Sequence, residues 1–361
     1  MKIPHNYKIR LAGFAVALGL LAGCATQSKT PKTGYYFFPA PPDEPRLQYL
    51  TSFSTQKEFH GGDENSFLNY VTGKRMPDNG FGKPYGAVTF GHKLYVCDTE
   101  LGSVVIADFT KRHMSMLPAE GESALNSPLN ITADADGFLY VADSGRNQIL
   151  IFDNNQNYVA AIGKLNEFMP RDVAVSRDRI YVADLKGHTI RAYDKATRTE
   201  LFTFPHGQDA TNEEVVLQTP TNLALDSRGR VYVADTGHFR VKIFDADGNF
   251  LHSVGEFGNG LGQFSRLKGI ALDHDNLLYT VDAMSQVIQI FNDDGRMLTF
   301  FGEPMTGKEF QGLPAKVVVD YEDVSYFKQY AAPGFKIEYL VFVINQFGSH
   351  KVNVFGFGSK H

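Results

Sequence analysis

The chain has 361 residues, of which 43% are hydrophobic and 21% charged, a balance typical of a soluble globular protein. Its formal net charge of −5 argues against a protein that binds nucleic acid by neutralising phosphates. Two cysteines exclude a disulfide framework, a cysteine-rich zinc module and a covalently attached c-type haem, while 34 glycines, 17 tyrosines and 29 phenylalanines indicate many strands and many turns.

Residues 1–23 have the pattern of a secretory signal peptide. Three basic residues precede an apolar run over 11–22, which is too short to span a bilayer. The run ends in Leu21-Ala22-Gly23-Cys24, which resembles the bacterial lipoprotein box. That resemblance implies cleavage before Cys24 and its acylation, with chains of the palmitate class, and Ala25 favours the outer membrane. We therefore expect a lipid-anchored protein of the cell envelope, facing the periplasm or the cell surface.

Residues 24–44 are the lipidated N-terminus and a tether, because they begin with a small, polar and basic stretch. Residues 46–53 follow with the composition of a strand. The segment 56–83 then precedes the first repeat. In it, Asn65 or Ser66 can cap a short helix over 67–71 that ends at Gly73.

One short unit recurs six times from about residue 80 onwards, at intervals typical of four-stranded propeller blades. Its centre is an aromatic residue, an apolar pair and a final Asp. The fourth copy is the clearest, with strands at 223–225, 231–234, 241–244 and 250–254. The six copies resemble the NHL repeat, which implies an all-β, six-bladed propeller over 45–361. They are centred on Tyr95-Val96-Cys97-Asp98, Tyr140-Val141-Ala142-Asp143, Tyr181-Val182-Ala183-Asp184, Tyr232-Val233-Ala234-Asp235, Tyr279-Thr280-Val281-Asp282 and Phe342-Val343-Ile344-Asn345.

The sixth copy ends the sequence at its third strand. We predict that residues 46–53 supply its outer strand and so close the ring without exposed sheet edges. The blade-to-blade links and the turns between second and third strands then share one side, which we call the top face. By this topology the 56–83 insertion also lies on the top face.

Alternate residues of the inner strands should line the central channel. Small or polar residues recur at one such position, and we expect Asn130, Asp172, Asn222 and Lys316 to ring the channel mouth. The surrounding top-face turns add basic and polar residues that suit an anionic, sugar or peptide ligand, or a partner protein. These candidates are Arg146, Arg171, His188, His238, Arg240, Lys268 and His350.

A second insertion, 321–335, falls between the first and second strands of the last blade and so lies on the opposite face. It combines acidic residues with Tyr326, Phe327 and Tyr330. Amphipathic aromatic loops suit protein contacts, so these three residues are candidates for docking.

Other features have structural explanations. The repeated Asp98, Asp143, Asp184, Asp235 and Asp282 fit carboxylates that accept backbone N–H groups in each tight turn. The stretch 255–262 is rich in glycine, but it only links two blades. Three histidines of the top face lie in blades that are not all adjacent, so we predict no metal site there. Propellers that resemble this one include an amidating lyase that holds metal through histidines one place after each repeat proline. None of the residues at those places in this chain is a histidine, so the resemblance does not extend to that metal site. They are Tyr85, Leu129, Arg171, Thr221, Lys268 and Ala315.

The expected function is a non-enzymatic scaffold that holds a protein partner at the cell envelope. Similar propeller lipoproteins accompany multihaem cytochrome systems, which makes such a system a candidate partner, although this chain has no haem-attachment motif and no predicted cofactor. Two alternatives remain. One is a lyase or hydrolase of a small polar substrate at the channel mouth, and the other is a sensor of sugars or cell-wall fragments. Nucleic acid is not an expected partner.

Overall fold

A computed structural model describes residues 34–60, 80–164, 167–209, 211–302 and 312–360. The chain divides into two units, Met1–Gly34 and Tyr35–His361, and every helix and strand named below belongs to the second. The signal peptide, most of the tether and the helix expected over 67–71 lie outside the described residues. Among the described helices, none has the length and apolar character to cross a membrane.

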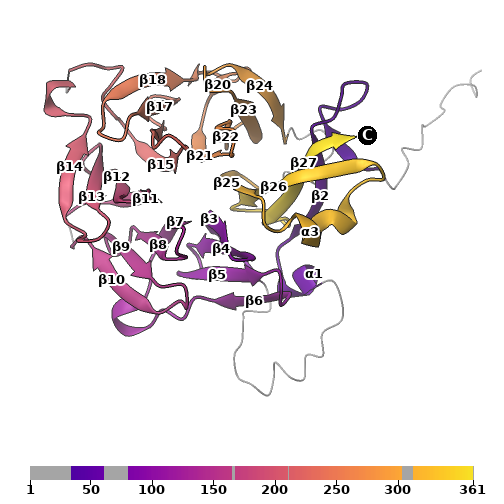
Figure 1. Ribbon diagram of the computed structural model, residues 1–361, viewed down its shortest axis with the longest axis horizontal. Helices are drawn as coiled ribbons and strands as arrows, with labels where there is room; N and C mark the ends of the chain where they lie inside the picture. The colour runs from indigo at the N-terminus through magenta and orange to yellow at the C-terminus, as the bar shows by residue number, and fades with distance from the viewer. Residues whose placement is uncertain (1–33, 61–79, 165–166, 210, 303–311, 361) are drawn as a thin grey trace, which may run out of the picture. The chain divides into compact units, whose positions relative to one another are not determined.

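The second unit is a six-bladed β-propeller, as the repeats predict (Figure 1). Each blade is an antiparallel sheet whose first strand lies nearest the axis. The strands are β3 Pro84–Phe90, β4 Lys93–Asp98, β5 Ser103–Asp108 and β6 His113–Met116 in blade 1; β7 Pro128–Ala133, β8 Leu139–Asp143, β9 Gln148–Phe152 and β10 Tyr158–Ile162 in blade 2; β11 Pro170–Val175, β12 Arg179–Asp184, β13 Thr189–Asp194 and β14 Glu200–Phe204 in blade 3; β15 Pro220–Leu225, β16 Val231–Asp235, β17 Arg240–Phe244 and β18 Phe250–Val254 in blade 4; β21 Leu267–Leu272, β22 Leu278–Asp282, β23 Val287–Phe291 and β24 Met297–Phe301 in blade 5; and β25 Pro314–Asp320, β26 Phe335–Asn345 and β27 Val352–Lys360 in blade 6.

The N-terminal part of the unit closes the ring, which confirms the prediction for residues 46–53. Strand β2 (Leu47–Phe53) pairs with β27, from Leu47 opposite Phe357 to Phe53 opposite Val352. A short strand, β1 (Tyr36–Phe38), pairs with the outer edge of β2. The last blade is therefore built from both ends of the sequence, and the N-terminal strands cover the edge that β27 would otherwise expose.

The hydrophobic core is divided among the blade interfaces. Six buried clusters lie between successive blades, one at each interface. Alternation along the strands explains this division. In β4, Leu94 and Val96 pack toward blade 6, whereas Tyr95 and Cys97 pack toward blade 2. Cys97 is fully buried, and burial raises the pKa of its thiol well above the usual value, so it is a packing residue.

The repeated aspartates end the second strand of blades 1 to 5, and they have the structural role that the sequence indicates. The Asp143 carboxylate accepts four backbone N–H groups. Two come from the turn that follows it, and two come from Asn126 and Ser127 in the link from blade 1. Asp98 and Asp282 bond in the same way. Each carboxylate thus fixes a turn of its own blade to the link that enters the blade.

Helical segments lie mainly in the links and insertions. A short parallel strand pair, β19 (Glu256–Phe257) with β20 (Gln263–Phe264), lies in the link from blade 4 to blade 5. The sequence predicts that the 56–83 segment crosses the top face. Residues 61–79 lie outside the described part of the chain, and helix α1 (Gln56–His60) lies beside β6 and not over the axis (Figure 1). Its Gln56 side chain bonds to Met114 of β6 and to the carbonyl of Arg112, and Phe59 packs on Tyr326 of the last-blade insertion. These elements are α1 Gln56–His60, α3 Val324–Phe327, η1 Gly121–Ser123, η2 Gly207–Asp209, η3 Lys328–Tyr330, β19 Glu256–Phe257 and β20 Gln263–Phe264.

Candidate functional site

The four residues expected at the channel mouth meet around the propeller axis. Asp172 is the hub. Its Oδ2 atom lies 3.2 Å from Asn222 Nδ2, 3.0 Å from the Leu223 N–H nitrogen and 3.3 Å from Lys316 Nζ. Asn130 donates to the Arg171 carbonyl at 2.8 Å, and its Oδ1 atom lies 3.4 Å from Asn222 Nδ2. All four side chains are buried.

This network joins opposite blades, and within it Asn222 Oδ1 is buried without a hydrogen-bond partner. Lys316 comes from blade 6 and Asp172 from blade 3, which face each other across the ring in Figure 1. The position is Gly86 in blade 1 and Gly269 in blade 5. A Cβ atom on Gly86 would lie 2.2 Å from Asn130 Oδ1. The network therefore braces the inner strands, and the ligand contacts expected for these four residues stay a prediction.

The histidines and arginines of the top-face turns are held by separate local bonds. His188 Nδ1 lies 2.6 Å from the Gln218 carbonyl oxygen, His238 Nδ1 lies 2.7 Å from Asp235 Oδ2, and His350 Nδ1 lies 2.7 Å from Ser52 Oγ. Arg146 bonds to Gln148 and to the Ala124 carbonyl. The Nε atom of Arg240 is buried without a partner. Within the described ranges, no three His, Cys, Asp or Glu residues are grouped to hold a metal ion.

The top face also carries exposed apolar residues that sequence reasoning missed. They are Phe257 and Leu261 in the link between blades 4 and 5, Met284 in the next turn and Phe347 in blade 6. Their exposed fractions are 68%, 59%, 61% and 49%. The ring of Phe257 packs edge-on against that of Phe239, with ring centres 4.7 Å apart. The pairing of β19 with β20 holds the loop in place. The sequence signal is the presence of a Phe and a Leu among the glycines of 255–262, since a plain link needs no large apolar residues.

Basic residues border these apolar side chains. Lys83 Nζ lies 5.2 Å from the ring centre of Phe347, and Lys268 Nζ lies 2.7 Å from Gln346 Oε1. Arg266 lies in the link that enters blade 5, and Arg171 is the second residue of β11 in blade 3. We call these residues together (Lys83, Arg171, Phe257, Leu261, Arg266, Lys268, Met284 and Phe347) the basic–apolar surface.

The docking residues predicted in the last-blade insertion are mostly not available. Phe327 is 1% exposed and packs on Phe109 and Phe342. Tyr326 is half-buried between Phe59 and Phe109, and Arg112 lies over its ring. Only Tyr330 is exposed, at 38%. The prediction that Phe327 docks a partner is therefore wrong, because its ring fills the seam between blades 6 and 1. Docking through Tyr326, which is half-buried at the same seam, stays a prediction.

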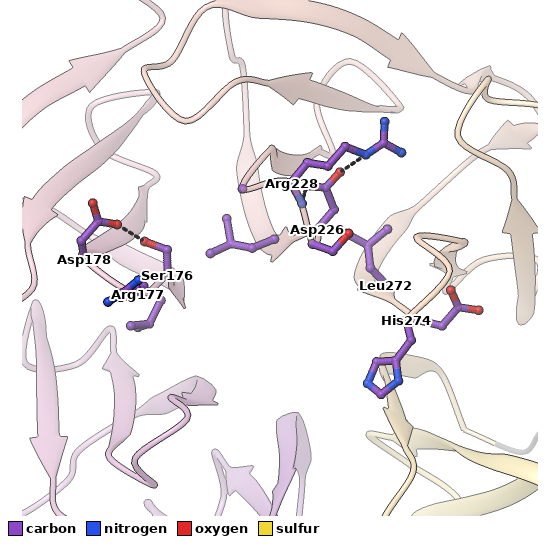
Figure 2. A pocket seen from close by; sticks show the side chains of 12 residues that line it. Ser176, Arg177, Asp178, Asp226, Arg228, Leu272 and His274 are labelled. Atoms are coloured by element: carbon purple, nitrogen blue, oxygen red, sulfur yellow. Dashed lines mark hydrogen bonds and ion pairs between the residues drawn. The ribbon is translucent and has the colours of Figure 1, made fainter.

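A pocket of about 830 Å³ opens on the opposite face from the predicted site (Figure 2). It is formed by the turns between the first and second strands of blades 3, 4 and 5. The carboxylates that line the pocket already accept hydrogen bonds from other protein groups. Asp226 binds Arg230 Nε at 2.6 Å and two backbone N–H groups, and Asp178 accepts from Ser176 at 3.1 Å. His274 stacks on Tyr321 with ring centres 3.7 Å apart. The pocket is polar and open, but its acids already have partners.

Two family models match parts of the chain. A model described as an NHL repeat matches residues 125–152, and a model described as a 6-bladed beta-propeller matches residues 208–302. Protein brain tumor of Drosophila melanogaster is 29% identical over 142 residues, which is 37% of this chain and 13% of that protein. The chloroplastic protein Suppressor of quenching 1 of Arabidopsis thaliana is 24% identical over 258 residues, 57% of this chain and 24% of that protein. The chain thus spans a quarter or less of either relative.

Solved propellers share the fold at low identity. A Bacteroides thetaiotaomicron protein of unknown function has a TM-score of 0.56 and 13% identity, covering 86% of this chain and 75% of its own. A Xanthomonas campestris gluconolactonase has a TM-score of 0.55 and 15% identity, covering 90% and 98%. A virginiamycin B lyase from Staphylococcus aureus has a TM-score of 0.52 and 12% identity, covering 76% and 95%. These likenesses concern the fold alone.

Proposed function

Because this chain is an NHL-repeat six-bladed β-propeller, we propose that it is a non-enzymatic scaffold that binds a protein partner through the basic–apolar surface of its top face. The observation that carries the proposal is the exposure of Phe257, Leu261, Met284 and Phe347 on the face that also carries these four cations, with Lys83 over the Phe347 ring. Large apolar side chains seldom stand exposed together on a monomer, and aromatic and Met residues are enriched where proteins dock.

The charge of the surface indicates the partner's chemistry. The whole chain is acidic, at −5, yet Lys83, Arg171 and Arg266 lie close enough to Lys268 to lower the pKa of its ammonium group. A partner segment that carries carboxylates between apolar side chains complements both properties. Burial of the Phe257 ring would supply an anchor of the kind found at the centre of interfaces.

Site-specific photo-crosslinking in cells tests this proposal. A photoreactive amino acid is placed at 257, 284 or 347 on the top face, and at 201 or 298 on the outer strands as controls, since Leu201 and Leu298 are each 49% exposed. We expect one common partner from the top-face positions and none from the controls. Charge reversal by Arg266→Glu should weaken capture. Equal capture from both sets of positions would contradict a docking role for this surface.

We also propose that lipid on Cys24 anchors the scaffold to the outer membrane. The support is the lipoprotein-box resemblance and the charged, short apolar run before it. Metabolic labelling with a palmitate analogue should mark the wild-type protein and not Cys24→Ser, and only the variant should be released from membranes. A multihaem cytochrome system is a candidate partner, and the identity of the crosslinked protein decides that question.

The pocket on the opposite face favours a second function, the binding or turnover of a small polar molecule such as a sugar. Its volume of about 830 Å³ is within the range of small-molecule sites, and Arg177, Ser227 and Arg228 line it. Sugars and cell-wall fragments should raise the thermal midpoint of the wild type and not of Arg177→Ala/Arg228→Ala. The absence of any such shift would count against this function.

A further inference from the structure

Within the part of the chain that the structure describes, Lys268 is a buried cation without an acidic partner. It is 8% exposed, its Nζ atom donates to Gln346 Oε1 at 2.7 Å, and it lies 5.1 Å from the ring centre of Tyr85. The two other buried lysines differ. Lys316 is 3.3 Å from Asp172, and Lys242 is 3.7 Å from Asp235. Lys268 has no recorded ion pair with any described residue. A charge buried in this way is costly unless a counter-charge reaches it.

The surroundings of Lys268 are positively charged. Burial, together with Arg266, Lys83 and Arg171, lowers the pKa of its ammonium group to about 8. Neither Arg171 nor Arg266 has a side-chain hydrogen bond or ion pair with the part of the chain that the structure describes. The carboxylate next to Arg171 in sequence, Asp172, is already bonded to Lys316 and Asn222. Four cations therefore converge at the upper end of the axis, and no acid among the described residues balances them.

Their arrangement follows from the fold. Tyr85, Arg171 and Lys268 each occupy the second position of an inner strand, in blades 1, 3 and 5. Alternate blades of a six-membered ring surround the axis on three sides. The same position is Leu129, Thr221 and Ala315 in blades 2, 4 and 6. The Asp172 network, one residue further along these strands, lies beneath them.

We propose that the upper end of the propeller axis is a carboxylate-binding site formed by Lys268, Arg171 and Tyr85. The guanidinium of Arg171 offers two parallel N–H donors that match a carboxylate, Lys268 supplies a buried positive charge, and the Tyr85 hydroxyl donates a further hydrogen bond. This inference deepens the proposed function and rests on it. The carboxylate is an Asp or Glu side chain, or the chain terminus, of the segment that docks on the basic–apolar surface.

Free anions test the site without the partner. Thermal unfolding of the full-length protein is followed at pH 7 in sodium succinate, sodium phosphate and sodium chloride of equal ionic strength. Succinate should raise the midpoint by several degrees above chloride in the wild type. Lys268→Met should abolish the succinate effect and raise the midpoint in chloride, because it removes an unbalanced buried charge. Lys336→Met, an exposed lysine at the start of β26, should respond as the wild type does.

Several results would overturn the carboxylate site. They are an equal response to succinate and chloride, a stronger response to phosphate than to succinate, or an unchanged succinate response in Lys268→Met. If Lys268→Met does not fold, Arg171→Gln provides the same comparison at a half-buried position.

Crosslinking separates this inference from the proposed function. If the wild type captures its partner from position 257 and Lys268→Met or Arg171→Gln captures it equally well, the docking surface stands and the carboxylate site fails. If succinate binds in a Lys268-dependent manner and no position on the top face captures a protein, the carboxylate site stands. The docking function then fails, and so does the assignment of the carboxylate to a docked protein segment.

Discussion

At the scale of single residues, the propeller depends on polar groups that are buried with their partners. Asp172 accepts hydrogen bonds from two other blades around the axis, through β15 of blade 4 and Lys316 of blade 6. Asp98, Asp143 and Asp282 each accept four backbone N–H groups at the top of their blades. The apolar clusters hold neighbouring blades together. The Asp172–Lys316 pair adds a link between blades that do not touch through their sheets.

The first prediction concerns this link. Asp172→Asn keeps the shape of the side chain but leaves the Lys316 ammonium buried without a carboxylate. We expect the free energy of unfolding in urea to fall by about 3–5 kcal/mol. The double variant Asp172→Asn/Lys316→Met should recover part of that loss, because it removes the unpaired charge. A single variant as stable as the wild type would show that the pair does not brace the ring.

The second prediction concerns the close approach of inner strands. Gly86→Ala would place a Cβ atom 2.5 Å from the Leu129 carbonyl oxygen and 2.5 Å from Asn130 Cα, so backbone must move. We expect a loss of about 1–3 kcal/mol in unfolding free energy. Gly207→Ala is the matched control, because nothing lies within 4 Å of a Cβ atom there. Equal stability of the two variants would contradict the crowding argument.

At the scale of elements, the last-blade insertion is part of the core. Helix α3 places Phe327 between Phe109 of blade 1 and Phe342 of blade 6, and Tyr326 covers Phe59 of α1. Two insertions that are 260 residues or so apart in sequence therefore support each other at the seam of the ring. This seam is also where β2 completes blade 6.

The third prediction separates packing from docking in this insertion. Phe327→Ala should lower the free energy of unfolding by about 3–5 kcal/mol, because the ring is buried and a cavity remains. Tyr330→Ala, at an exposed position of the same segment, should cost much less. Denaturant titration measures both. If the two changes cost the same, Phe327 is not a core residue.

Local sequence could predict the elements but not all their neighbours. The alternation and turn residues of each repeat were sufficient to predict six blades, because those signals lie within a stretch of about fifty residues. The closing strand could be predicted because the sixth copy lacks an outer strand of its own. The environment of Tyr326 and Phe327 depends on Phe59 and Phe109, which no local pattern connects to them. Composition alone made an aromatic insertion look like an exposed loop.

At the scale of the whole molecule, the same limit applies to the candidate site. The sequence correctly brought Asn130, Asp172, Asn222 and Lys316 to the axis, because blade symmetry relates them. It could not show how they bond to one another, since that depends on distances across the ring. Lys268 was a candidate for its charge alone, and its lack of an acidic partner among the described residues became visible only when six inner strands were placed around one axis.

Two sets of titrating groups give the folded protein a distinctive pH dependence. At the seam, His92 Nδ1 lies 2.9 Å from Asp323 Oδ1, while Asp320 and Glu322 stand nearby. Burial raises the pKa of Asp323 to about 6, and hydrogen bonding to Asp323 raises that of His92. Both groups bind protons more tightly in the folded than in the unfolded protein. Stability should therefore fall as the pH rises from about 4 to about 7.

The groups at the axis act in the opposite direction and at higher pH. Lys268 has a pKa of about 8 when folded, against an ordinary value of 10.5, so the unfolded chain holds this proton more tightly. Stability should rise between about pH 8 and pH 9.5, below the range in which tyrosines titrate. Lys242 and Lys351, whose pKa values burial also lowers, add to this rise.

The fourth prediction combines these effects. The free energy of unfolding, measured in urea from pH 4.5 to 9.5, should pass through a minimum near neutral pH, with changes on the order of 1 kcal/mol on each side. Asp323→Asn should flatten the acidic side only, and Lys268→Met should reduce the alkaline rise only. A bound carboxylate should also reduce that rise, because it stabilises the charged lysine in the folded state. If Asp323→Asn leaves the acidic side unchanged, the seam does not titrate as described. If succinate leaves the alkaline side unchanged while it binds, Lys268 is not its ligand.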